Sequence, residues 1–254
     1  MSSTVSRAIE ILELCSAEPR TAAQIAAVLG VHRTTVLRTL LTLQDAGLVR
    51  QTETGVFGTG FRLAALAKSA MAHFDLRGIA HPHLKDLSDR IGVTVQFAVP
   101  DRDRIRYVDK IEPRDSIVLN TEIGGDAVVS TSGVAKAILA HLSGERRRSI
   151  LDRATFETFT ERSITSREAF ERELTRVQER GWSFDDGEYD ELSNCIAAPV
   201  RDHADDVAGA VSITAFRTRL DIDALQQHLP ALLTTTEAIS RDLGWRGSAG
   251  SGSA

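Results

Sequence analysis

The residues with the most specific chemical character are basic and hydroxyl-bearing side chains that cluster between positions 32 and 38. They are His32, Arg33, Thr34, Thr35 and Arg38. Arginine donors are long enough to reach base edges in a DNA groove, and hydroxyl groups can bind phosphate oxygens. Arg50, in a polar segment that follows, could add a contact to the DNA backbone. The pattern therefore predicts a local surface that binds double-stranded DNA.

Two predicted helices would position these side chains. The apolar stripe of the first helix consists of Ala22, Ile25, Ala26 and Leu29. Thr21 is a favourable N-cap, and Gly30 can end the helix because glycine tolerates the left-handed conformation of a short turn. The stripe of the second helix consists of Val36, Leu37, Leu40, Leu41 and Leu43. This is the layout of a helix-turn-helix, whose second helix enters a major groove.

Residues 48–57 predict two short strands around a polar turn, which is the wing that can follow a recognition helix. With a further helix near residues 5–14, the order of elements predicts a winged helix-turn-helix domain at residues 1–60. A helical hairpin can also be only a packing unit. Charge does not separate the two interpretations, because residues 1–62 carry six arginines against five acids, a net charge of +1.

The whole chain has 254 residues, enough for one large or two modest domains, and a net charge of −5. That charge argues against a general coating of nucleic acid or membrane, so any DNA contact would be local. No apolar run approaches a membrane span and no signal-peptide pattern opens the chain, so we expect a cytoplasmic protein with no membrane partner. Residues 247–254 are predicted to be a flexible tail.

Residues 61–78 predict a linker helix, with Arg77 and Gly78 at its end. Its apolar stripe consists of Leu63, Ala67, Ala70 and Phe74. This stripe could pair with a second copy of the chain, and two copies on paired half-sites would read more bases than one winged domain can. We therefore expect a homodimer or a dimer of dimers.

Residues 79–246 alternate between helical and strand patterns, so the whole chain is predicted to be α+β. Strands are predicted at residues 93–99, 105–111, 117–121, 195–200 and 207–214, with helices at residues 79–91, 132–142 and 165–180. Side chains alternate across a strand, so Cys195 shares one face with Ala197, and Ser212 shares one with Thr214. This small, polar face could form the floor of a small-ligand pocket, or it could face solvent as an ordinary sheet surface.

The sequence gives little support for a catalytic site or for a metal-binding site. Cys195 could be a nucleophile, but no histidine is tied to it by any motif, and small buried cysteines are usually inert. The two cysteines, Cys15 and Cys195, fall in different predicted domains, so no disulfide framework is expected. His73, His81 and His83 do not have the spacing of a closed metal-ligand set. The chain is therefore predicted not to be an enzyme, and no metal or other cofactor is expected.

Three stretches resemble the IclR family of bacterial transcriptional regulators, over about residues 4–245. They are Val5-Ser-Arg-Ala-Ile-Glu-Ile-Leu12, Leu29-Gly-Val-His-Arg-Thr-Thr-Val-Leu-Arg38 through Val49, and Gly181-Trp-Ser-Phe-Asp-Asp186 with Cys195–Val200 and Gly209–Thr214. One departure is Leu192-Ser193-Asn194, which stands where the family usually has a glycine before the strand.

The resemblance implies a winged helix-turn-helix, a linker helix and a C-terminal α/β effector-binding domain similar to GAF and profilin folds. It also implies dimers, often paired into tetramers, whose binding to operator DNA changes when a small organic or aromatic acid binds. By motif, Gly133 and Val134 would lie at a ligand-lining turn, and Asp185, Cys195, Ser212 and Thr214 at polar pocket positions. Repression is the commoner outcome in the family; an activator, or less readily a metal-responsive regulator, is the alternative.

Overall fold

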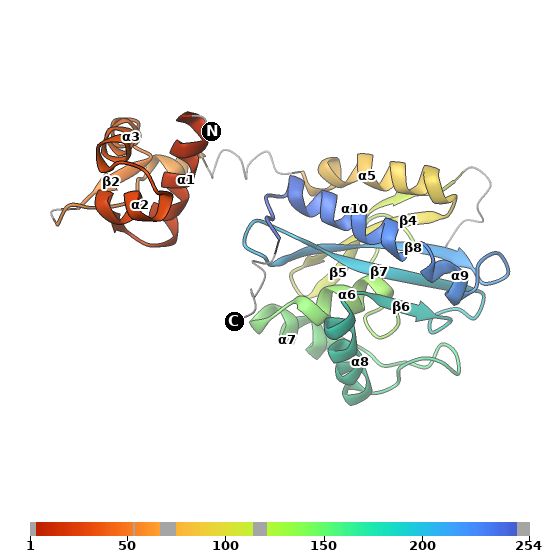
Figure 1. Cartoon of the computed structure of the whole chain (residues 1–254). Helices are drawn as coiled ribbons and strands as arrows, with labels where there is room; N and C mark the ends of the chain where they lie inside the picture. The colour runs from red at the N-terminus through yellow and green to blue at the C-terminus, as the bar shows by residue number, and fades with distance from the viewer. Residues whose placement is uncertain (1–3, 53, 67–74, 114–120, 248–254) are drawn as a thin grey trace. The chain divides into compact units, whose positions relative to one another are not determined.

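The computed structural model describes residues 4–52, 54–66, 75–113 and 121–247, and the chain forms two compact units, residues 1–74 and 75–254 (Figure 1). The first unit contains helices and a small sheet, and the second contains a larger sheet with helices on both faces. The predicted α+β class, a winged helix-turn-helix followed by an α/β domain, is confirmed.

The first unit contains a winged domain at residues 4–59. Its helices are α1 (Thr4–Ala17), α2 (Ala22–Leu29) and α3 (Arg33–Asp45). Its antiparallel sheet has the order β1 (Arg20–Thr21), β3 (Val56–Thr59) and β2 (Val49–Gln51). The core that holds these elements together includes Ile11, Ile25, Val36, Leu40 and Phe57, all at most 1% exposed.

Both ends of α2, including the turn that leads into α3, have the capping residues that the sequence predicted. The Thr21 hydroxyl accepts a hydrogen bond from the Gln24 backbone N–H at 3.3 Å, and the Gln24 side chain accepts one from the Thr21 N–H at 2.8 Å, which is a complete capping box. Gly30 ends α2 with φ of 62°, a left-handed conformation that other residues rarely adopt. The start of α3 is fixed relative to α2 by this turn.

The predicted linker helix is only partly covered by the described residues. Residues 62–66 are helical, whereas residues 67–74, with most of the predicted stripe, lie outside the described residues. Its predicted end at residue 78 is wrong, because α5 (Leu76–Ile91) begins at Leu76 and includes Gly78. A Cβ added to Gly78 would lie 2.7 Å from Oδ2 of the N-cap Asp75. The glycine therefore makes room at a helix start instead of ending a helix.

The second unit is built on a five-stranded antiparallel sheet. Its strand order is β5 (Arg104–Ile111), β4 (Thr94–Asp101), β8 (Val207–Phe216), β7 (Ser193–Arg201) and β6 (Ser183–Asp186). The four predicted strands at 93–99, 105–111, 195–200 and 207–214 are confirmed with slightly different ends. The sequence did not predict β6. Most of the strand predicted at 117–121 lies outside the described residues, and Thr121 is not in a strand.

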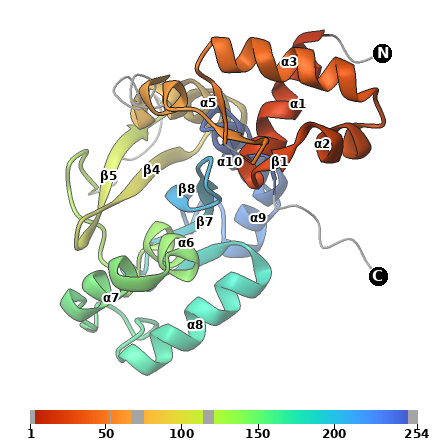
Figure 2. The ribbon, with the colours of Figure 1, turned by 90° about the vertical axis from the view of Figure 1, so that its left-hand side faces the viewer.

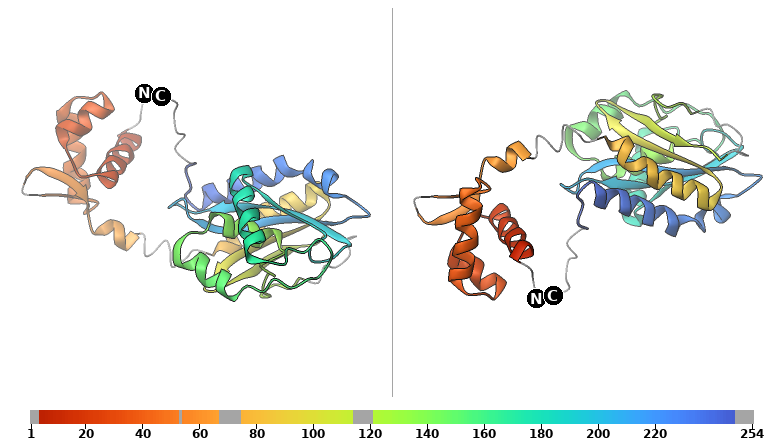
Figure 3. Two further views of the ribbon diagram at one scale, coloured as in Figure 1. Left: turned by 90° about the horizontal axis from the view of Figure 1, so that it is seen from below. Right: turned by 90° about the horizontal axis from the view of Figure 1, so that it is seen from above.

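Helices cover both faces of this sheet (Figures 1 and 2). One face is covered by α5 and α10 (Leu229–Asp242), which lie side by side (Figure 3), with the short α9 (Ile222–Gln226) nearby. The other face is covered by α6 (Gly133–His141), α7 (Gly144–Arg153) and α8 (Arg167–Arg180). Each face has its own apolar core, with Leu84 and Ile213 in one and Ile138 and Phe170 in the other. None of the helices in the described segments has the length and apolar composition needed to cross a membrane.

Candidate functional sites

The exposed face of α3 presents the side chains that the sequence singled out. Arg33, Thr34 and Arg38 are exposed, while Val36 and Leu40 point into the core with no exposed surface. Because the helical period is 3.6 residues, Thr34 and Arg38 lie on the side of α3 opposite to Val36 and Leu40, and Arg33 is exposed as the first residue of the helix. Both arginines are therefore available to a partner from outside the chain.

The remaining predicted DNA contacts are near the amino end of α3. His32 is its N-cap residue, and its Nδ1 lies 2.8 Å from the Thr34 hydroxyl. Thr35 is half-buried, so its hydroxyl is less accessible than that of Thr34. Arg50 is exposed on β2 and pairs across the sheet with Gly58. Within the described part of the chain, none of the arginines on α3 and β2 forms an ion pair.

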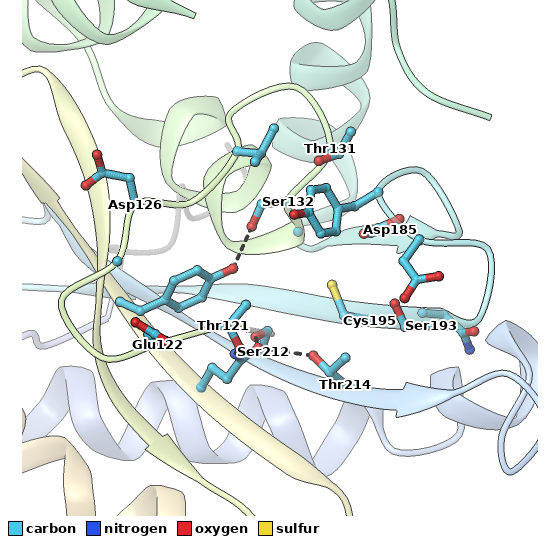
Figure 4. A pocket seen from close by; sticks show the side chains of 18 of the residues that line it. Thr121, Glu122, Asp126, Thr131, Ser132, Asp185, Ser193, Cys195, Ser212 and Thr214 are labelled. Atoms are coloured by element: carbon cyan, nitrogen blue, oxygen red, sulfur yellow. Dashed lines mark hydrogen bonds between the residues drawn. The ribbon is translucent and has the colours of Figure 1, made fainter. Parts of the chain in front are cut away.

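The second unit contains a pocket of about 480 Å³ on the α6 side of the sheet (Figure 4). The described residues that line it are Gln96, Tyr107, Thr121, Glu122, Gly125, Asp126, Val128, Thr131, Ser132, Gly133, Asp185, Tyr189, Asp190, Ser193, Asn194, Cys195, Ser212, Thr214 and Phe216. Five of the six predicted effector positions are among them, although they come from different parts of the chain. Volume and polar lining both suit a small-molecule site.

The floor of the pocket belongs to two adjacent rows of side chains across four strands, of which Gln96, Asp185, Cys195, Ser212 and Thr214 line the pocket. In one row the register joins Gln96, Ser212, Ala197 and Ser183; in the other it joins Thr94, Thr214, Cys195 and Asp185. Each row lies two residues from the other along every strand, so both point to the same face. Ser212 is only 2% exposed, so this face is not an open sheet surface.

Gly133 brings the start of α6 close to this floor. A Cβ at this position would lie 2.6 Å from the Cys195 Sγ, so a larger residue would collide with the sheet. The Ser183 hydroxyl also donates to the Gly133 carbonyl at 2.7 Å. Val134, the sixth predicted effector position, is 1% exposed in the apolar core and is not among the described lining residues. It lies about 100° further round the helix, which turns its side chain away from the pocket.

Gln96 is a lining residue that the sequence analysis missed. Its Oε1 accepts hydrogen bonds from the hydroxyls of Ser212 at 3.5 Å and Thr214 at 3.3 Å, and its Nε2 donates to Thr121. A signal was present in the sequence, because Gln96 is the one amide in the run 93–99 and lies two residues from Thr94, on the face that forms the floor. The Tyr107 hydroxyl, 3.1 Å from that of Ser132, and the loops at 121–126 and 189–190 carried no comparable pattern.

Buried charges lie at the end of the pocket nearest β6. Asp185 is 8% exposed and accepts a hydrogen bond from the Glu188 backbone N–H at 2.6 Å. Burial raises the pKa of the Asp185 carboxyl to about 6, although the positive charge of Lys136 opposes the shift. Behind it, the Lys136 Nζ donates to Glu188 Oε1 at 2.5 Å, and burial raises the pKa of Glu188 to about 7. Asp185 in the lining and Glu188 behind it are therefore carboxyl groups that can change protonation near neutral pH.

The geometry also bears on the two alternative functions, catalysis by Cys195 and metal binding by histidines. Burial raises the pKa of the Cys195 thiol to about 12, so the sulfur is a protonated thiol and a poor nucleophile at neutral pH. His81 Nδ1 lies 2.7 Å from an Asp109 oxygen, and His83 Nε2 lies 2.7 Å from an Asp242 oxygen. His73 lies outside the described residues. No group of three or more histidine, cysteine or acidic side chains in the described segments could hold a metal ion.

Comparison with known families gives two matches that together span most of the chain. The model of the "IclR helix-turn-helix domain" matches residues 4–53. The model described as "Bacterial transcriptional regulator IclR C-terminal" matches residues 68–241, which is more than half of the 254 residues.

Individual relatives agree with these matches over nearly full length. The HTH-type transcriptional regulator XynR of Escherichia coli is 29% identical over 245 residues, covering 95% of this chain and 97% of that protein. The transcriptional repressor IclR of E. coli is 28% identical over 229 residues, covering 88% and 84%. The crystal structure of the Agobacterium tumefaciens repressor BlcR superposes with a TM-score of 0.74 at 23% identity, covering 95% of this chain and 97% of that one, and it supports the fold.

Proposed function

Because the chain belongs to the IclR family of bacterial transcriptional regulators, we propose that it is a repressor whose operator binding is controlled by a small molecule in the pocket of its second unit. Residues 1–60 would bind DNA and residues 75–246 would bind the effector. The arginines of α3, which are exposed and form no ion pair with any residue that the structure describes, support the first role most directly. The protein would act in the cytoplasm, where bacterial operator DNA lies.

The DNA contacts divide by side-chain chemistry. Arg33 and Arg38 would reach base edges in the major groove, since arginine makes two hydrogen bonds to guanine. His32, Thr34 and Thr35 would contact phosphates near the start of α3, with Thr35 the least accessible of them. Arg50 would contact the backbone beside the groove from β2. Phosphate contacts position the winged domain, and base contacts give it sequence preference.

A homodimer, alone or paired into a tetramer, would supply the specificity that one short recognition helix lacks. Two winged domains on paired half-sites read twice as many bases and predict a two-fold symmetric operator. Sedimentation of the full chain with and without operator DNA would measure the number of copies.

Control by the effector requires two conformations with different affinities for DNA. A ligand shifts DNA binding only if it binds one of them better than the other. Gly133, Asp185, Cys195, Ser212 and Thr214 surround the proposed ligand. The ligand we propose for this pocket is the small organic or aromatic acid implied by the family resemblance.

Selection of sites from a random pool of double-stranded DNA, followed by mobility-shift titration, tests this function. We expect a symmetric site whose half-sites lie about one helical turn or a multiple of it apart. A reporter placed behind this site would be repressed, and a transcript increase would instead identify an activator. Failure to enrich any sequence would contradict the DNA-binding role.

The effector role is tested with a compound that raises the melting temperature of the folded protein. Ser212→Leu would fill the pocket and should abolish release from DNA by that compound while DNA affinity stays unchanged. Ser212→Ala, which removes only the hydroxyl, gives a second variant if the larger side chain unfolds the protein. Thr175→Leu, at an exposed position on α8, is the matched control. A normal response of Ser212→Leu would place the effector elsewhere.

A further inference from the structure

Resting on the proposed function, we propose that the pocket takes up its organic acid together with one proton, and that Asp185 holds this proton. The acid stays ionised, and the protonated Asp185 carboxyl donates a hydrogen bond to its carboxylate. The proton comes from solvent, and no covalent bond of the ligand changes. Release of operator DNA would then require less of the acid as the pH falls.

The geometry of the floor places Asp185 beside the position that an acid would occupy. Asp185 pairs in register with Cys195 on the next strand, and both residues line the pocket (Figure 4). The start of α6 lies close to Cys195, because a Cβ added to Gly133 would lie 2.6 Å from the Cys195 Sγ. The amino end of a helix attracts anions, and neighbouring strands are about 4.8 Å apart. An acid at this helix end would therefore place its charge about one strand spacing from Asp185.

The Asp185 carboxyl is buried but can still accept a proton. It is 8% exposed, and its Oδ1 accepts a hydrogen bond from the Glu188 backbone N–H at 2.6 Å. The backbone N–H of Tyr189 also donates to this carboxyl. A carboxyl group has about four lone-pair positions, so two N–H bonds leave a position for a proton. The proton can be held without loss of the bonds that fix the side chain.

The groups that face Asp185 supply little positive charge. Lys136 of α6 lowers the pKa of Asp185, but this lysine also pairs with Glu188, whereas Asp186 raises it. Burial raises the pKa of Cys195 and of Tyr107, so both are uncharged at neutral pH. The remaining charged or titratable groups nearby are Arg162 and Arg217, which pair with Asp186, and Tyr189 and Asp190 in the loop after β6.

A second cation, Lys110, lies on the pocket face at the other side of the sheet. It pairs in register with Gln96, donates to the Thr121 carbonyl at 2.9 Å and pairs with Glu112 at 2.7 Å. Lys110 is on β5 and Asp185 on β6, which are the two outer strands, with three strands between them. Lys110 can attract an acid to the pocket, but it is too distant to neutralise a charge beside Asp185.

The remaining carboxylates of the lining do not change this conclusion. Asp126 pairs with Arg104 at 2.7 Å and with Arg106 at 3.7 Å, so its charge is largely offset. Glu122 adds a further negative charge to the lining. An acid that enters the pocket therefore meets Asp185 without a cation between the two carboxyl groups among the residues that the structure describes.

Two carboxyl groups this close share one proton more readily than they carry two charges. Burial already raises the pKa of Asp185 to about 6, and the charge of a bound acid raises it further, past neutral pH. Asp185 is therefore mostly ionised in the free protein at pH 7 and protonated in the complex. Because this coupling is reciprocal, a proton that is favoured by the acid also favours binding of the acid.

Calorimetry of the full-length protein with single acids tests the proposal. Propanoate, lactate, benzoate and 4-hydroxybenzoate would be screened by thermal shift at pH 6, and each acid that binds would be titrated from pH 6 to pH 8. Carboxylic acids stay ionised over this range, so a change in affinity comes from the protein. We expect the affinity to fall about tenfold from pH 6 to pH 8.

Two further measurements identify the cause of this pH dependence. Titration at pH 7 in two buffers of different ionisation enthalpy should show that most of one proton is taken up with each acid. The matched amides, such as benzamide for benzoate, carry no charge, so their affinity should not fall as pH rises. These measurements need only the wild-type protein.

Asp185→Asn gives the sharpest test, because asparagine can donate a hydrogen bond at any pH but does not titrate. Its oxygen can still accept from the Glu188 N–H. At pH 8 the variant should bind the acid about tenfold more tightly than wild type does, with equal affinity at pH 6 and no proton uptake. Glu179→Gln, the corresponding change at an exposed position on α8, should keep the wild-type pH dependence.

Three results would overturn the proposal: binding of the acids that is independent of pH, proton uptake that persists in Asp185→Asn, or no binding of any of the acids at pH 6. If the variant does not fold, the wild-type proton count decides alone. Operator binding is measured in the same preparation without acid. If it is normal and acids bind without a proton, the proton linkage is wrong and the proposed function stands. If no DNA is bound, the proposed function itself fails.

Discussion

The two candidate sites differ in the burial of their charged side chains. On α3, Arg33 and Arg38 project into solvent without ion pairs in the described structure. In the second unit, Asp185, Lys136 and Glu188 are all less than 10% exposed and depend on one another. The first site can therefore lose a charge at little cost to folding, whereas the second cannot. Substitutions on α3 should therefore change DNA affinity without changing stability, whereas substitutions at the pocket should change ligand binding and stability together.

The largest effect is expected for Lys136→Met. Removing this side chain leaves Glu188 as a buried charge without its partner, which destabilises a protein by about 3–5 kcal/mol. The loss should shrink below pH 7, where Glu188 can take up a proton. Urea unfolding followed by tryptophan fluorescence measures it, because both tryptophans, Trp182 and Trp245, belong to the second unit.

Two variants make this prediction falsifiable. Adding Glu188→Gln to Lys136→Met removes both charges and should recover most of the lost stability. Lys85→Met breaks the exposed ion pair with Asp89 and should cost less than about 0.5 kcal/mol. Equal losses for Lys136→Met and Lys85→Met would show that the buried Lys136–Glu188 pair contributes no more to stability than an exposed pair does.

The next effect concerns pH. The folded-state pKa of Asp185 is raised from 3.8 to about 6, so the folded protein binds more protons between these values. The contribution of Asp185 to the free energy of unfolding is therefore fully present below about pH 4. It is lost as pH rises through 6, which lowers the free energy of unfolding by up to about 3 kcal/mol. Besides burial, the groups that act on the Asp185 carboxyl are the charge of Lys136, the backbone N–H groups of Glu188 and Tyr189, and the charge of Asp186.

Asp185→Asn removes this titration and should flatten the fall in stability between about pH 4 and pH 6. The difference between wild type and variant isolates it from other titrating groups. Glu179→Gln should leave the wild-type profile unchanged. Parallel profiles for wild type and Asp185→Asn would contradict the raised pKa and, with it, the charge linkage of the pocket.

On α3, substitution of an arginine should lower the affinity for operator DNA without lowering the stability of the protein. Arg33→Ala and Arg38→Ala should each weaken operator binding by about 1–3 kcal/mol, with relaxed sequence preference where a base contact is lost. Thermal stability should stay within about 0.5 kcal/mol of wild type, because both side chains are exposed. Mobility-shift titration measures the first quantity and thermal unfolding the second. Arg172→Ala, exposed on α8, is the charge-matched control, and unchanged affinity of both α3 variants would exclude them from the interface.

The same contrast explains what the sequence could predict. The helix-turn-helix depends on neighbouring residues, such as Thr21 with Gln24 and the glycine at position 30, so local rules were sufficient. The family resemblance drawn from these motifs is confirmed by both family models. Strand alternation likewise predicted that Cys195 and Ser212 share a face.

Features that depend on distant contacts could not be predicted in this way. The four residues of β6 include two aspartates, which are uncommon in strands, and their pairing with β7 is visible only in the fold. The motif placed Val134 in the pocket, but the helix phase turns it into the core. Gly78 resembled a helix end because its role depends on the side chain of Asp75.

The smallest expected effect tests whether the local structure of α2 is independent of the pocket in the second unit. Thr21→Ala removes one half of the capping box with Gln24 and should destabilise α2 by about 1 kcal/mol. Hydrogen exchange of peptides from α2 should accelerate, while exchange in β7 and β8 stays unchanged. Thr42→Ala, at an exposed position inside α3, removes a hydroxyl that caps no helix and should be neutral or slightly stabilising. If Thr21→Ala also accelerated exchange at the pocket floor, the two units would unfold together, and the separation between a locally encoded surface and a cooperatively built pocket would no longer hold.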